Sequence, residues 1–247
     1  MKDLQDYFYK KIEANKYFDR WISNEKKEYF LVCDKKLRKE KLNILKCINS
    51  NLEIKNKKVL EIGCFVGDLL FYLKKNFNCK VEGIEASKKA CNLSNKIFKL
   101  KLENRIFLES KFFKLEKKNF KKFDLIICDD VLSWMDRKFI LQTLSSIDYL
   151  LKEEGYLFLR DFCPKKNFSF KNHHYPNKHI YNFKQKNGHK EFFLLSGRYK
   201  LKYEKVFNSE KYQRVKVKFK QANIWSYSIL QKQGSFTHPI KRFDGKK

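Results

Sequence analysis

The stretch that most constrains the fold is residues 58–68, KVLEIGCFVGD. It begins with a short β-branched and aliphatic run that ends at Gly63, and Gly67 follows four residues later. From Leu69 the pattern LLFYLKKNF is typical of a helix. A strand, a glycine turn and a helix in this order predict the opening unit of a doubly wound α/β sheet. In such sheets a ligand binds outside the carboxyl ends of the strands, over the first turn.

The residues of this turn favour one kind of ligand. A dinucleotide-binding loop needs glycine at the positions that Phe65 and Asp68 hold here. The chain has 56 Lys and Arg residues, yet none lies between Val59 and Leu73, where the charged residues are Glu61 and Asp68. This local negative charge disfavours a pyrophosphate. It favours a ligand with an ammonium and a sulfonium group, such as S-adenosylmethionine (SAM).

The segment V-L-E-I-G-C-x-x-G resembles motif I of the class I SAM-dependent methyltransferases, with Phe65 where the family usually has glycine. The resemblance covers residues 59–161 and, more loosely, most of the chain. It implies an α/β fold, a three-layer α/β/α sandwich with a mostly parallel seven-stranded sheet and an antiparallel C-terminal hairpin. The motif I residues implied to contact SAM are Glu61, Gly63, Cys64, Phe65 and Gly67.

Composition sets the broad class. At 247 residues, with 43% hydrophobic and 16% aromatic residues, one globular domain with a large core is expected. The formal net charge of +28 has two interpretations: an RNA partner, or a codon bias that enriches lysine. We favour the codon bias, because a protein that recognises phosphate groups specifically would use arginine more often, which binds phosphate through two parallel hydrogen bonds.

The seven cysteines are odd in number and form no CxxC pair. This pattern indicates reduced, buried thiols in a cytoplasmic protein, not a disulfide framework or a zinc site. The N-terminus lacks the apolar region of a signal peptide. No run approaches the roughly 18 apolar residues of a membrane span. We therefore expect a cytoplasmic protein without a membrane span, and the sequence leaves its oligomeric state open.

Residues 1–50 are expected to form a helical cap segment. An aromatic cluster, YFDRWI, covers Tyr17–Ile22, and a second helix is predicted over about Lys35–Ile48. The resemblance implies that such a segment covers the cofactor, so that Tyr17 or Trp21 closes over SAM. The alternative is that these aromatic residues only pack the helices onto the sheet.

The second and third strands each suggest a cofactor contact. The second, over 79–87, reaches Glu85 about 20 residues past the glycine turn, where an acid accepts hydrogen bonds from ribose hydroxyls. We expect Glu85 and Ala86 to contact SAM, and Ser87 to cap a helix that runs to about residue 101. The third is predicted over Asn104–Ser110, and the resemblance implies an adenine contact just past it, from Glu109 or Ser110.

The fourth strand, over Phe123–Asp130, is almost entirely apolar, as expected of a strand buried on both faces. It ends in Asp129 and Asp130, beside the topological switch point, so one of these acids should face the methyl-bearing sulfur. Trp134 is expected to pack on the adenine or on the acceptor, or to serve only in helix packing. The remaining expected elements are a helix over Asp136–Leu151 ended at Gly155, a fifth strand over Tyr156–Phe162, an antiparallel pair over 197–207 and 221–232, and a basic tail over 233–247.

Within the SAM-binding domain (51–232), residues 163–193 show no regular pattern and hold four of the five histidines. A long irregular segment usually has a function, so we expect it to bind the acceptor. It also resembles methyltransferases of sugar pathways in a D-F-x-P sequence, a following histidine and a Tyr-x-x-Lys over Tyr181–Lys184.

A hydroxyl acceptor needs a base. The candidates are His174 or His173, with Asp161 as a positioning partner, although both histidines could simply lie on the surface. No metal site is expected, because these histidines lack i, i+4 spacing and Pro176 breaks any helix there.

The leading hypothesis is a SAM-dependent methyltransferase that acts at an oxygen of a small-molecule or sugar acceptor. The alternatives are an RNA methyltransferase that uses the basic surface, and a non-catalytic SAM-fold binding module. Methylation of a base amine is disfavoured because no proline follows Asp130. Methylation at a pyrimidine carbon uses a cysteine nucleophile, and is disfavoured because Cys163 precedes Pro164 where the family has the reverse order.

Overall fold

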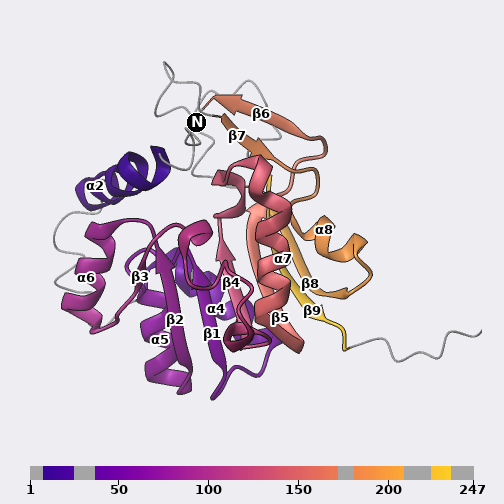
Figure 1. Ribbon diagram of the computed structural model, residues 1–247, viewed down its shortest axis with the longest axis horizontal. Coiled ribbons are helices and arrows are strands. Elements are labelled where there is room, and N and C mark those ends of the chain that lie inside the picture. The colour runs from indigo at the N-terminus through magenta and orange to yellow at the C-terminus, as the bar shows by residue number, and fades with distance from the viewer. Residues whose placement is uncertain (1–7, 25–36, 172–180, 209–223, 235–247) are drawn as a thin grey trace, which may run out of the picture.

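Figure 1 shows the computed structural model, which describes residues 8–24, 37–171, 181–208 and 224–234. The strands are β1 (Lys58–Ile62), β2 (Lys80–Glu85), β3 (Glu103–Asn104), β4 (Phe123–Asp129), β5 (Leu151–Phe162), β6 (Phe168–Lys171), β7 (Tyr181–Lys184), β8 (Tyr199–Asn208) and β9 (Ile224–Lys232). The α-helices are α2 (Ala14–Asn24), α4 (Lys39–Asn51), α5 (Asp68–Phe77), α6 (Lys88–Phe98), α7 (Ile140–Leu150) and α8 (Lys190–Leu195). Short helical turns are η1 (Tyr9–Glu13), η2 (Phe107–Glu109), η3 (Lys117–Asn119), η4 (Leu132–Trp134) and η5 (Arg137–Phe139).

The main sheet has seven strands in the order β3-β2-β1-β4-β5-β9-β8. The first five are parallel, and β9 runs antiparallel to both β5 and β8. The expected mostly parallel sheet with an antiparallel C-terminal pair is therefore confirmed. In this order the chain reverses between β1 and β4, so the switch point lies where the sequence placed it.

The sheet is covered on both faces, which gives the expected three layers. Alternate residues of a strand point to opposite faces. In β1, Val59 packs with the helices α4, α5 and α6, whereas Leu60 and Ile62 pack on the other face with α7 and α8. The core therefore consists of two apolar layers, with the central strands buried between them.

Two predictions for the sheet are wrong in detail. The third strand ends at Asn104, and Phe107–Glu109 form a 3₁₀ turn, because the chain leaves the edge of the sheet to bury Phe107 in the core. Gly155 does not end the helix. The helix α7 ends at Leu150, and β5 begins directly at Leu151, opposite Phe123. The β4–β5 pairing shifts register between Phe123 and Leu125, so residues 152–155 form an irregularity in β5.

The segment 163–193 is more regular than predicted. Strands β6 and β7 form a separate antiparallel pair, and α8 follows. Both strands have only four residues, which is too short for a clear periodic pattern. In Figure 1 this pair and α2 lie at the end of the sheet where the parallel strands have their carboxyl ends. His173, His174 and the 233–247 tail, apart from residues 233 and 234, lie outside the described residues.

Candidate active site

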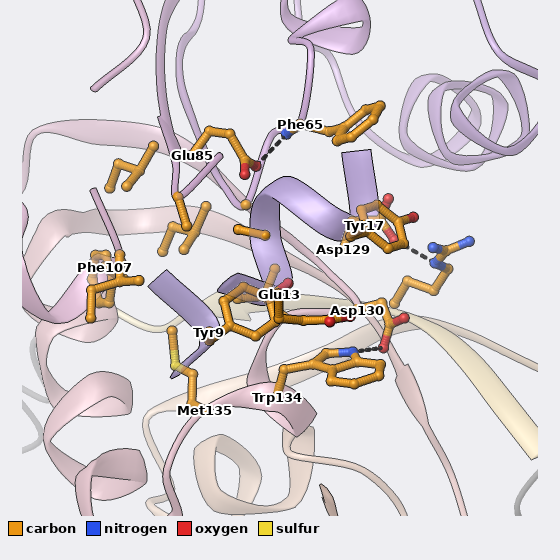
Figure 2. A pocket seen from close by; sticks show the side chains of 18 of the residues that line it. Tyr9, Glu13, Tyr17, Phe65, Glu85, Phe107, Asp129, Asp130, Trp134 and Met135 are labelled. Carbon is orange, nitrogen blue, oxygen red and sulfur yellow. Dashed lines mark hydrogen bonds and ion pairs between the residues drawn. The ribbon is translucent and has the colours of Figure 1, made fainter. Parts of the chain in front are cut away.

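A cavity of about 450 Å³ lies at the carboxyl ends of β1, β2, β4 and β5, below η1 and α2 (Figure 2). Its floor comes from the strand ends and the turns after them. Its roof comes from the N-terminal helices. The predicted site residues that line it are Gly63, Phe65, Glu85, Ala86, Asp129, Asp130 and Trp134, together with the expected roof residues Tyr17 and Trp21.

The glycine turn has the geometry that the sequence indicated. Gly63 has φ +72°, and a Cβ there would lie 2.5 Å from Val131 Cγ2, so only glycine fits without a shift. Phe65 has φ +53°, the left-handed conformation that glycine adopts more easily. Its ring turns toward the roof, with ring centroids 4.9 Å from Trp21 and 5.6 Å from Tyr17. Phe65 therefore preserves the turn and adds a contact surface for α2.

Glu85 is held at one end of the cavity by backbone donors. Its Oε2 accepts a hydrogen bond from the Phe65 N–H at 2.8 Å, and its Oε1 accepts one from the Ser87 N–H at 2.7 Å. Burial raises the pKa of Glu85. A carboxylate has about four acceptor positions, so this fixed carboxylate has capacity left for the two hydroxyls of a ribose. Ser87 also caps α6 as predicted, by accepting from the Ala90 N–H.

An apolar wall adjoins Glu85. It is formed by Ile84, Ala86 and the turn residues Ile106, Phe107 and Leu108. Neither of the two residues predicted to contact the adenine, Glu109 or Ser110, lines the cavity. Ser110 lies outside the cavity, where its hydroxyl donates to the Phe107 carbonyl and accepts from the Phe112 N–H. Glu109 forms an ion pair with Lys10.

Five cationic side chains line the cavity: Arg20, Arg38, Lys41, Arg105 and Arg160. Lys41 Nζ lies 2.5 Å from Glu61 Oε1 and 2.7 Å from Asp129 Oδ2. Arg160 also pairs with Asp129. Arg38 pairs with Asp68, so both acids of residues 59–73 have a cationic partner, and the expectation of a simply negative turn is wrong.

The acids of this cluster differ in role. Although burial acts in the opposite sense, Arg160 and Lys41 lower the pKa of Asp129 to about 2, so it stays ionised. Glu61 is fully buried behind Lys41 and does not line the cavity. Cys64 and Gly67 do not line it either, because they support the turn from within. These three residues, predicted to contact SAM, thus lie behind the cavity surface.

Asp130 has a different environment. It lines the cavity, has φ +56°, and accepts a hydrogen bond from Trp134 Nε1 at 3.2 Å (Figure 2). Burial raises the pKa of Asp130 to about 7, although Lys184 and Arg160 oppose the shift. A carboxyl group with such a pKa can take up a proton near neutral pH.

Asp161 does not line the cavity. Its carboxylate accepts hydrogen bonds from Ser133 Oγ, the Phe162 N–H and the His189 N–H, each at 2.8 Å, and lies 2.6 Å from His189 Nδ1. Although burial opposes it, His189 with Ser133 lowers the pKa of Asp161 to about 2. Among the described residues, the histidine that pairs with Asp161 is His189, and the predicted partners His173 and His174 lie outside them.

The side chains fit SAM: an apolar wall for a flat base, a fixed acid for ribose hydroxyls, and cations and acids beside the glycine turn for a zwitterionic chain. Among the described residues, no group of three or more metal-binding side chains occurs. Within the same part of the chain, no helix has the length and apolar composition needed to cross a bilayer.

Comparisons with known proteins agree with this reading. A family model described as a methyltransferase domain matches residues 53–214. A solved SAM-dependent methyltransferase from Methanosarcina mazei is 19% identical, with a TM-score of 0.56 over 76% of this chain and 97% of that one. The 1,6-didemethyltoxoflavin-N1-methyltransferase of Burkholderia thailandensis, with bound 1,6-didemethyltoxoflavin and S-adenosylhomocysteine, is 11% identical, with a TM-score of 0.59 over 93% and 91%.

The N-methyltransferase NodS from Bradyrhizobium japonicum, in complex with S-adenosylhomocysteine, is 13% identical, with a TM-score of 0.53 over 80% of this chain and 87% of that one. At these identities the solved structures show a shared fold. No curated protein sequence matches the chain. The family model, however, spans more than half of the 247 residues. The chain therefore belongs to the methyltransferase domain family, and SAM is its cofactor.

Proposed function

We propose that the protein transfers a methyl group from SAM to an oxygen of a small-molecule or sugar acceptor. The observation that carries this proposal is Asp130, a cavity-lining carboxyl group whose pKa burial raises to about 7. A hydroxyl must lose its proton as its oxygen attacks the methyl carbon. A base with a pKa near the working pH is suited to take that proton.

SAM supplies a methyl group that its sulfonium centre already activates. The residues of the chain bind and orient the reactants. Glu85 accepts hydrogen bonds from the ribose hydroxyls, and the wall around Phe107 receives the adenine. Arg38 and Lys41 offer positive charge to the methionine carboxylate, beside the carboxylate of Asp129. Asp130 receives the acceptor proton.

The size of the cavity suits a small ligand such as SAM. Its volume of about 450 Å³ falls within the range of small-ligand pockets. Tyr9, Tyr17 and Trp21 cover it from the N-terminal segment, which supports the assignment of residues 1–50 as a cap. The segment 163–193 is proposed to contribute the acceptor side, because β7 lies against η4, which carries Trp134.

A nitrogen acceptor is the second candidate. Two solved structures with this fold are N-methyltransferases by name, and the same cavity and base would serve an amine that binds in its protonated form. Those proteins are 11% and 13% identical to this chain, so they support the possibility through the fold alone.

The test is methyl transfer from isotopically labelled SAM to a panel of sugars, phenols, amines and structured RNA. We expect labelled hydroxyl compounds. We also expect roughly 100-fold slower transfer by Asp130→Asn, with little change in SAM affinity. Asp124→Asn is the matched control, because Asp124 lies on the same strand at the end away from the cavity and binds the Lys58 N–H.

Three results would overturn the proposal. Transfer to amines alone would make the protein an N-methyltransferase. Transfer to RNA alone, with affinity that falls steeply with salt, would make it an RNA methyltransferase. Saturable SAM binding without transfer to any compound of the panel would favour a non-catalytic binding module.

A further inference from the structure

A fully buried lysine lies beside the candidate active site. Lys184, the last residue of β7, has no exposed surface. Its Nζ lies 3.0 Å from the centroid of the Phe162 ring and 5.5 Å from the centroid of the Trp134 ring. Burying an ammonium group among apolar rings costs free energy, and cation–π attraction offsets part of that cost. A lysine is almost never fully buried unless it is paired, so its position calls for an explanation.

The ring on which Lys184 packs holds the proposed base. Trp134 Nε1 donates a hydrogen bond to Asp130 Oδ1 at 3.2 Å, and Figure 2 shows the indole directly beside that carboxyl group. Lys184, Trp134 and Asp130 therefore form a continuous chain of contacts from the β6–β7 pair to the cavity. Lys184 does not line the cavity, so its influence on the reaction has to pass through Trp134 or through its charge.

We propose that Lys184 is a positioning residue. Its ammonium group, packed on Phe162 and Trp134, holds the indole in the orientation that donates to Asp130. Its positive charge also stabilises the Asp130 carboxylate. The inference rests on the proposed role of Asp130 as the base. It also assigns a role to the Tyr-x-x-Lys sequence, which places Lys184 at the end of β7.

The charges around Asp130 show in which direction Lys184 shifts the pKa of Asp130. The groups that face it are Asp129 on β4, Arg160 and Asp161 on β5, Tyr9 on η1, Tyr17 on α2 and Lys184 on β7. Arg160 pairs with Asp129, and Asp161 pairs with His189. Burial lowers the pKa of Lys184 to about 7, against the pull of the Asp130 and Asp161 carboxylates. Loss of its positive charge must therefore raise the pKa of Asp130 further.

The test is a pH titration of the tryptophan indole N–H signals by ¹H–¹⁵N NMR. The chain has only three tryptophans, and the signal that Trp134→Phe removes is that of Trp134. In the wild type this signal should shift with a midpoint near neutral pH, because its acceptor ionises there. In Lys184→Met the midpoint should rise by about one pH unit. In Lys184→Arg, which keeps the charge, it should stay near the wild-type value.

Lys232→Met is the matched control. Lys232 is a buried lysine on β9 that pairs with Asp148, so its loss tests the general effect of removing a buried ammonium group. It should leave the Trp134 midpoint unchanged. The acid limb of the pH profile of methyl transfer should move with the NMR midpoint in Lys184→Met and stay in place in Lys232→Met.

Two outcomes would overturn the inference: a Trp134 signal that does not move between about pH 5 and 9 in the wild type, or equal midpoints in the wild type and Lys184→Met. The first needs no variant at position 184, so it decides the matter even if Lys184→Met does not fold. Neither result depends on an acceptor or on turnover. Failure of this inference is therefore distinguishable from failure of the proposed methyl transfer.

Discussion

Phe65 stands where related methyltransferases usually have glycine, and the structure gives a physical reason to retain it. A left-handed φ costs a residue with a Cβ roughly 1–2 kcal/mol. The ring, however, is only 6% exposed and packs with Tyr17, Phe18 and Trp21 of α2. Arg38 lies 5.0 Å from the same ring centroid. The residue that departs from the usual glycine therefore joins the cofactor turn to its roof.

Phe65→Gly should loosen the roof. The substitution relieves the backbone but loses a buried ring, so we expect a net loss of roughly 2 kcal/mol in the free energy of unfolding. Amide hydrogen exchange in α2 should accelerate. Phe112→Ala, which removes a buried ring from the opposite core layer, is the control and should leave α2 no more exposed than the rest of the chain. Unchanged exchange in α2 would contradict the role given to the ring.

Glu85→Gln should weaken SAM binding. A neutral amide replaces a carboxylate whose position two backbone N–H groups fix, and hydrogen bonds to a charged acceptor are worth roughly 1.5–3 kcal/mol each. We expect an affinity loss of about 30-fold or more by calorimetric titration. Glu82→Gln, on the same strand but paired with Lys111 and Lys122 outside the cavity, is the control. Equal SAM affinities for the two variants would contradict the assignment of Glu85 to the ribose hydroxyls.

Among the elements, sequence reasoning succeeded where a strand is long and apolar. The strands β1, β2 and β4 were predicted closely, because continuous or alternating apolar residues identify them locally. It failed where an element is short, as in β6 and β7. It also failed at β3, where burial of Phe107 draws the chain away from the edge of the sheet.

The same division applies to the site. Glu85 and Asp130 could be predicted because they end strands whose carboxyl edge is known from topology alone. Lys41 and Arg160 could not, since they approach Asp129 from α4 and β5, 88 and 31 positions away in sequence. No local pattern records such a contact. Tyr9 was missed for the same reason, because the packing of η1 over the sheet brings it into the cavity.

At the scale of elements, Asp161 anchors α8 to β5 through His189, the residue just before that helix. The folded-state pKa of Asp161, about 2, lies below that of an unfolded Asp, about 3.9. Its contribution is thus fully present above about pH 4 and is lost as pH falls through about 2. We expect Asp161→Asn to cost roughly 2–3 kcal/mol at neutral pH.

Denaturant unfolding at several pH values checks this expectation. The stability difference between the wild type and Asp161→Asn should shrink as pH falls from about 4 to about 2, because protonation removes the same charge from the wild type. Asp124→Asn is the comparison at the other end of the sheet: although burial opposes it, Lys152 lowers the pKa of Asp124 too, so the same trend is expected with a smaller amplitude because Asp124 is more exposed. A difference that stays constant over this range would show that the Asp161 charge does not anchor α8.

For the whole molecule, the question is what the formal net charge of +28 does. The cavity does not account for it. Each of its Arg and Lys side chains has a carboxylate partner: Arg20 with Glu13, Arg38 with Asp68, Lys41 with Glu61 and Asp129, Arg105 with Glu103, and Arg160 with Asp129. The surplus lies outside the cavity, for example on Lys200, Lys202 and Lys205 of the edge strand β8, which are exposed. Lysine on an edge strand also deters pairing with another chain.

If the surplus charge is compositional, RNA should bind to the outer surface without reaching the active site. We expect affinity for a labelled structured RNA, measured by fluorescence anisotropy, to fall steeply between about 50 and 400 mM salt, because counterion release drives such binding. Glu85→Gln should bind RNA like the wild type, SAM should leave RNA affinity unchanged, and no methyl group should reach the RNA. RNA affinity that rises with SAM, and that loses this SAM dependence in Glu85→Gln, would mean that RNA and cofactor bind neighbouring, coupled sites, because linkage is reciprocal between two ligands that favour the same state. The basic surface would then be part of the acceptor site.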